Sequence, residues 1–76
     1  MTETSGVFIA NGGTSTFTIP HSLNLTPNSY FVIAGSQDAI GPFYVSSVSS
    51  INLNISYPVS TKSGTNNIKL IWRALP

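Results

Sequence analysis

The stretch Ile51-Asn52-Leu53-Asn54-Ile55-Ser56-Tyr57 decides the fold class of this chain of 76 residues. Apolar and polar side chains alternate strictly along it. Because successive side chains of a β-strand point to opposite faces, the apolar residues share one face and the polar residues share the other. The stretch is therefore predicted to form an antiparallel strand with one face in a core and the other in water.

The same alternation recurs outside this stretch. Residues 68–73 alternate in the same way, and Ile71 falls on the otherwise charged face, which indicates that this face is partly covered. Further strands are predicted at residues 6–10, 14–19, 29–34 and 43–48. The first two of these should form a hairpin around Asn11-Gly12-Gly13, since Asn and Gly tolerate the positive φ of tight turns.

Six short strands in one chain predict an all-β fold, either an antiparallel sandwich or a flattened barrel, and of these we expect a small antiparallel β-sandwich. Residues 6–76 are predicted to form a single β-sandwich domain, and residues 1–5 a flexible N-terminal lead. The apolar residues expected on the inward faces form the predicted core: Phe17, Ile19, Val32, Phe43, Val45, Leu53, Ile55, Leu70 and Trp72.

The chain carries more apolar side chains than two thin sheets can bury. The run at residues 29–34 is almost continuously apolar and is predicted to be buried on both faces. Charged residues make up only 7% of the chain, against about 25% in an average soluble domain, and Ser, Thr and Asn take their place. Two explanations stay open: either an oligomer buries much of the surface, or the surface is a hydroxyl- and amide-rich one suited to an exposed extracellular setting.

We expect the oligomer, because a chain of this size buries only about 60% of its unfolded surface and gains from outside support. The residues predicted to lie in the interface between copies are Tyr30, Phe31, Ile33, Ile71 and His21. For His21 the main expectation is a hydrogen bond to loop backbone, and the alternative is an axial site where copies of His21 hold a metal or an anion.

Several function classes are disfavoured. The chain has no Cys and one His, so we expect no disulfide, no resident metal and no cofactor. A net charge of +1 gives no basic patch for nucleic acid, and no apolar run is long enough to insert into a membrane as a helix. The acidic residues are Glu3 and Asp38 alone, which argues against paired-carboxylate catalysis, and we expect no enzymatic activity.

A carbohydrate site is a further candidate, because flat aromatic rings can stack on the apolar faces of sugars. The candidate residues are Tyr44 and Tyr57, with Asp38 as a hydrogen-bonding neighbour. For each tyrosine, packing in the core is the competing interpretation.

Several segments resemble a known family. They are Phe17-Thr18-Ile19-Pro20-His21-Ser22-Leu23, Thr26-Pro27, Ser36-Gln37-Asp38-Ala39, Gly41-Pro42-Phe43-Tyr44-Val45-Ser46, Gly64-Thr65-Asn66-Asn67-Ile68 and Trp72-Arg73-Ala74. In their order along the chain and in their residues, they are similar to the small distal β-domains of tailed-phage tail fibres, tailspikes and related virion proteins. The resemblance implies a homotrimer that caps a fibre, aids its trimerisation or touches the host surface, with no catalytic residue.

The resemblance also implies the partners and the location. The chain would associate with copies of itself and with a longer tail-fibre or tailspike polypeptide, on the surface of a virion. It opens with Met1 and a short polar lead instead of a fibrous shaft, so both a separately made protein and a domain of a longer one stay open.

Three functions follow from these observations. The first is a phage virion structural module, a trimerising or capping distal domain of a tail fibre, tailspike or receptor-binding assembly. The first alternative is a lectin-like module that recognises host-surface glycan, and the second is a capsid decoration protein.

Overall fold

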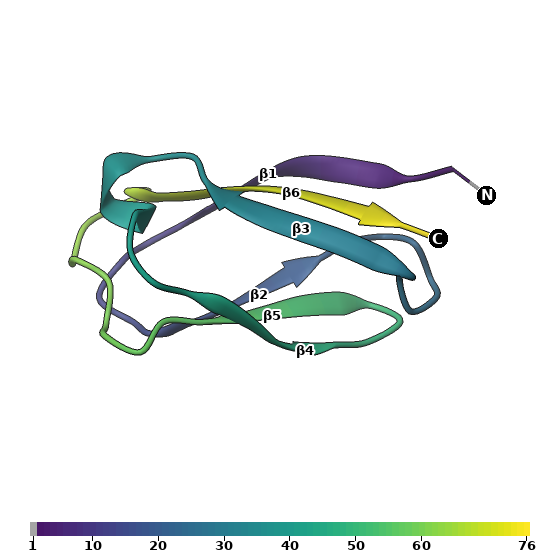
Figure 1. The fold of residues 1–76 in the computed structure, drawn as a ribbon. Helices are drawn as coiled ribbons and strands as arrows, with labels where there is room; N and C mark the ends of the chain where they lie inside the picture. Colours follow the sequence, from purple (N-terminus) through teal and green to yellow (C-terminus); the bar gives the residue numbers. More distant parts are fainter. Residues whose placement is uncertain (1) are drawn as a thin grey trace.

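Two three-stranded antiparallel sheets form the molecule, and the computed structural model describes residues 2–76 of it. The first sheet has the order β1-β6-β3 and the second has the order β2-β5-β4. Figure 1 shows the two sheets as stacked layers, with both chain termini at the same end. The strands are β1 (Thr4–Ala10), β2 (Thr16–Pro20), β3 (Ser29–Ala34), β4 (Tyr44–Val48), β5 (Asn52–Ser56) and β6 (Ile68–Leu75).

The predicted all-β sandwich of six strands is confirmed. A short 3₁₀-helix, η1 (Gln37–Ala39), lies between β3 and β4, and within residues 2–76 no helix is long and apolar enough to cross a bilayer. The single chain has an accessible surface of 4373 Å², close to the value of about 4,500 Å² expected for a compact monomer of its mass.

The core lies between the inward faces of the two sheets, with β5 and β6 as the central strands. Leu53 and Ile55 of β5 are fully buried, as the alternation of residues 51–57 predicts. Phe8 of β1 meets Phe17 of β2 across the sandwich, edge to face, with ring centroids 6.3 Å apart. The partly buried side chains that pack against the buried residues include Val32, Phe43, Val45 and Trp72, all of them predicted for the core.

The predicted hairpin between the first two strands is wrong, because β1 and β2 belong to different sheets. The Asn11-Gly12-Gly13 segment carries the chain from one sheet to the other. Its polar groups bond to the connection between β5 and β6: Gly13 N–H donates to the Thr61 carbonyl (3.1 Å), and Asn66 N–H donates to Asn11 Oδ1 (2.8 Å). Contacts distant in sequence, and not a local turn, therefore set the direction of this segment.

Three smaller expectations also need correction. Thr4 and Ser5, assigned to the flexible lead, begin strand β1, and Thr4 Oγ1 donates to the carbonyl of His21; Met1 lies outside the described residues. The strand at residues 29–34 is an edge strand whose outer side chains are exposed within the single chain, so it is not buried on both faces. Ile51 lies in the β4–β5 turn and is 62% exposed, because the strand begins only at Asn52.

Candidate functional site

The outer face of the first sheet is unusually apolar. We call it the apolar face, and it consists of the exposed side chains Val7, Ile9, Phe31, Ile33 and Ile71. Val7 pairs with Ile71, and Ile71 pairs with Ile33, so three aliphatic side chains form one row across all three strands. Exposed apolar side chains that gather in one patch with a polar rim are typical of an interaction surface.

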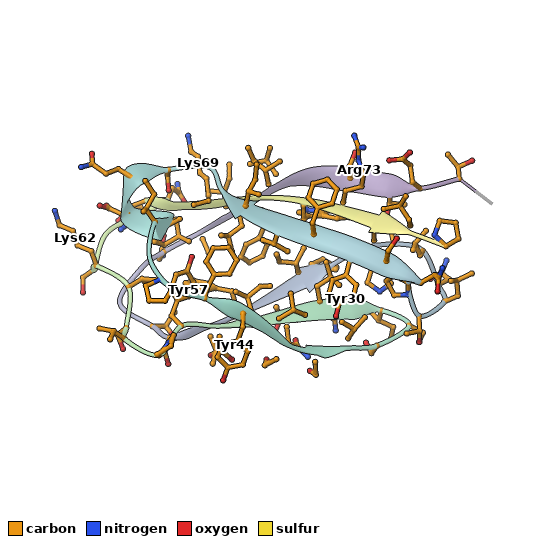
Figure 2. The ribbon with its side chains drawn as sticks, in the orientation of Figure 1. Tyr30, Tyr44, Tyr57, Lys62, Lys69 and Arg73 are labelled. Atoms are coloured by element: carbon orange, nitrogen blue, oxygen red, sulfur yellow. The ribbon has the colours of Figure 1, made fainter. Side chains whose placement is uncertain are left out.

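Charged side chains interrupt the apolar face on its central strand β6, where Lys69 pairs with Ile9 and Arg73 pairs with Phe31. Figure 2 shows Lys69 and Arg73 projecting from the first sheet on the side away from the second sheet. The guanidinium of Arg73 pairs with Glu3 at 2.9 Å and lies 5.6 Å from the ring centre of Phe31. Because both partners of the ion pair are about half exposed, the pair itself adds little stability.

The outer face of the second sheet is polar but uncharged. Its side chains are hydroxyls and amides on all three strands, and Asn54 Nδ2 donates to Ser47 Oγ at 2.7 Å. Tyr44 is the aromatic residue of this face, and Figure 2 shows it pointing away from the first sheet. The surplus apolar side chains and the uncharged polar surface thus lie on opposite faces of the sandwich.

A pocket of about 430 Å³ lies at the end of the sandwich opposite the chain termini. We call it the loop pocket. One wall is the η1 segment at residues 37–42, and the other is the segment at residues 57–62 that leaves β5. The lining includes polar side chains (Gln37, Asp38, Ser60, Thr61 and Lys62) and apolar ones (Ile40, Pro42, Tyr57 and Val59).

The side chain of Asn67 joins the loops around this pocket. Its Nδ2 donates to Asp38 Oδ2 (3.1 Å) and to the Lys62 carbonyl (2.9 Å), and its Oδ1 accepts from Gly12 N–H (2.8 Å). Gly12 allows this approach, because a Cβ there would collide with the carbonyl of Lys62. One amide therefore ties together three segments that are far apart in the sequence.

Replacing Asn67 with Ala is expected to lower the free energy of unfolding by about 2 kcal/mol, because three hydrogen bonds are lost and Gly12 N–H loses its acceptor. Urea denaturation followed by circular dichroism measures the change. Asn28→Ala is the matched control, since Asn28 is exposed and its variant should unfold like the parent. Equal stability of the two variants would contradict a joining role for Asn67.

The expectation that Tyr57 is an exposed sugar-stacking residue is wrong. Tyr57 is 6% exposed, Figure 2 shows it between the two sheets, and its ring packs edge to face on Phe17 with centroids 5.8 Å apart. Its hydroxyl donates to the Ala39 carbonyl at 2.8 Å, which fixes η1 to the core. Burial raises the pKa of Tyr57 above its ordinary value of 10.0, because the charged form loses its hydration.

His21 is not available to another copy, so its assignment to the interface is wrong. The residue is fully buried within the single chain. Its Nδ1 accepts from Leu23 N–H at 3.2 Å and its Nε2 lies 2.8 Å from the Ser49 carbonyl. Because a carbonyl only accepts, Nε2 carries the hydrogen. The main expectation for His21, bonding to loop backbone, is confirmed.

The structure separates the other predicted site residues. Asp38 lines the loop pocket, whereas Tyr44 lies on the outer face of the second sheet, so these two do not form one site. Phe31, Ile33 and Ile71 lie together on the apolar face. Tyr30 is exposed but points to the opposite side of β3 from Phe31. Within residues 2–76, no three His, Asp or Glu side chains are placed to hold a metal ion.

Sequence reasoning missed the role of Asn67 and the exposure of Ile40 and Val59 beside the loop pocket. Ile40 is 72% exposed and Val59 is 75% exposed. No local sequence pattern predicts the role of these residues, since each lies in an irregular connection and acquires its neighbours from loops distant in sequence.

Comparisons of the chain with protein-family models, with curated proteins and with solved structures give no match.

Proposed function

We propose that this chain is a structural module of a phage virion, a homotrimer that serves as a trimerising or capping distal domain in a tail fibre, tailspike or receptor-binding assembly. The observation that carries self-association is the apolar face, where five large apolar side chains remain exposed in the single chain. The trimeric state and the virion setting are supported by the resemblance of the segments named above to distal tail-fibre and tailspike domains.

The apolar face suits contact with other copies of this chain. A hollow of about 260 Å³ lies in it, lined among others by Val7, Phe31 and Ile71, so the surface offers both projections and a recess. Each half-exposed aliphatic side chain that becomes buried contributes about 1 kcal/mol to association. Lys69 and Arg73 lie in the rows on either side of the aliphatic row, so their long side chains can reach water while that row is covered.

Replacing Val7 with Lys is expected to convert the assembly to monomers, because an ammonium within the aliphatic row cannot be desolvated without a partner charge. Sedimentation velocity at micromolar concentration measures the state, with a three-chain species expected for the parent protein. Val59→Lys is the control, since Val59 is an exposed valine outside the apolar face, and its variant should keep the parent's mass. A monomeric parent protein at these concentrations would overturn the proposal.

The setting in the particle is tested separately. Antibody labelling of purified particles in electron micrographs should mark the tail tip. Labelling of the head instead would favour a capsid decoration protein and contradict the tail assignment.

A further inference from the structure

The loop pocket is not needed for association through the apolar face, and it has its own recognition chemistry. None of the five apolar-face residues lines it. The chain termini lie at the other end of the sandwich (Figure 1), so a polypeptide attached there leaves the pocket open. Its volume of about 430 Å³ falls in the range of about 300–1,000 Å³ typical of small-molecule sites.

Both walls of the loop pocket are held in place by hydrogen bonds. The 57–62 wall is fixed by Thr61, whose N–H and Oγ1 both donate to the Thr14 carbonyl, at 3.0 and 2.8 Å. The 37–42 wall is fixed by the Tyr57 hydroxyl at the Ala39 carbonyl and by Asn67 at Asp38. A ligand therefore meets a formed surface and does not have to order the loops on binding.

The polar groups of the pocket fit a neutral ligand that both donates and accepts hydrogen bonds. Asp38 has Oδ2 engaged by Asn67, and the carboxylate as a whole offers about four acceptor sites, so it can still accept from hydroxyl groups. Lys62 and the Gln37 amide supply donors. Asp38 and Lys62 carry opposite charges, so the pocket has no net charge that would select an anion or a cation, which suits an uncharged partner.

The apolar groups of the pocket fit a ligand with a carbon face. Ile40 and Val59 are among the most exposed apolar residues of the chain, and they line opposite walls. Pro42 adds a rigid apolar ring between β4 and η1. A pyranose ring combines such a C–H face with a rim of hydroxyl groups.

We propose that the loop pocket binds a neutral saccharide unit. Asp38 accepts from two of its hydroxyl groups, Lys62 and Gln37 donate to others, and Ile40 and Val59 cover its C–H face. This site differs from the tyrosine-based site that the sequence suggests, since Tyr44 lies on the outer face of the second sheet and the Tyr57 ring is in the core. The proposal does not depend on the oligomeric state.

The test is a titration of ¹⁵N-labelled protein followed by two-dimensional amide NMR. The probes are D-glucose, D-galactose, D-mannose, L-rhamnose and N-acetyl-D-glucosamine, each at millimolar concentrations, with inorganic phosphate and tetramethylammonium chloride as ionic comparators. At least one sugar should shift the amides of residues 37–42 and 57–62 saturably, and neither ion should do so.

Substitutions of residues that line the loop pocket test which side chains contact the sugar. Asp38→Ala should weaken binding of the responding sugar more than tenfold, since two charge-assisted hydrogen bonds to its hydroxyl groups are lost. Ile40→Ser should lower the affinity for the same sugar about threefold, because apolar contact is lost. Ile51→Ser, the same substitution at an exposed position outside the pocket, should leave this affinity unchanged. Because Ile40 is exposed, its variant should fold like the parent, so a loss of binding reports on the pocket.

Three outcomes overturn the proposal. They are no shift with any sugar of the panel, shifts of the loop pocket with phosphate or tetramethylammonium alone, and sugar-induced shifts centred on Tyr44 and the second sheet. Failure of the self-association test leaves these readouts unaffected, so the two proposals fail separately.

Discussion

Ile55→Ala is expected to lower the free energy of unfolding by about 4 kcal/mol, the largest effect predicted for this chain. Ile55 is fully buried on β5, the central strand of the second sheet, and it is paired with Phe17 on one side and Val45 on the other. Truncation removes buried apolar surface and leaves a cavity that two flanking strands cannot readily fill. A domain of 76 residues has a total stability of only about 4–11 kcal/mol, so this one substitution removes between about a third and all of it.

Urea denaturation monitored by circular dichroism measures this effect. All variants are compared at one protein concentration, because self-association makes apparent stability depend on concentration. Ile51→Ala is the matched control, since Ile51 lies in the β4–β5 turn and is exposed, and its cost should stay below about 1 kcal/mol. Similar midpoints for the two variants would show that the core is not centred on β5.

His21→Leu is expected to cost about 3 kcal/mol of unfolding free energy, although leucine is apolar and of similar size. The ring bonds Leu23 N–H through Nδ1 and the Ser49 carbonyl through Nε2. Leucine leaves the buried Leu23 N–H without an acceptor, which costs about 1–3 kcal/mol. The lost bond to the carbonyl of Ser49, an exposed residue, adds about 1 kcal/mol. The ring also links the segment after β2 to the β4–β5 turn, two places that are 28 residues apart in the sequence.

His21→Gln separates hydrogen bonding from shape, because its amide both donates and accepts. This variant should recover part of the lost stability in the same urea experiment. Amide hydrogen exchange adds a local readout, since Leu23 N–H should exchange much faster in the leucine variant. Unchanged stability and unchanged exchange in His21→Leu would contradict the bonding role of the ring.

The proposed self-association and the proposed saccharide binding use different parts of one small sandwich. We propose association for the apolar face of the first sheet and saccharide recognition for the loop pocket at the end remote from the termini. Since the two share no lining residue, a trimer would present three open pockets, and several weak saccharide contacts would combine through avidity.

The core could be predicted from the sequence because its cause is local. Strand alternation has a period of two residues, so Leu53, Ile55 and Leu70 can be assigned to the interior from their immediate neighbours alone. The same rule places Ile71 among charged residues on an outer face, and the structure shows it there beside Val7 and Ile33. Fold class, strand positions and the surplus of apolar surface thus follow from the sequence by itself.

The pairing of the strands and the loop pocket were decided only by the tertiary structure. An Asn-Gly-Gly turn is compatible with a hairpin, yet Gly12 N–H bonds to Asn67, 55 residues away, and the chain crosses to the other sheet instead. Burial of His21 and Tyr57 likewise depends on which distant carbonyls come within reach. Such contacts arise from the packing of the whole chain and leave no periodic pattern in the sequence. They therefore cannot be predicted from the residues adjacent in the chain.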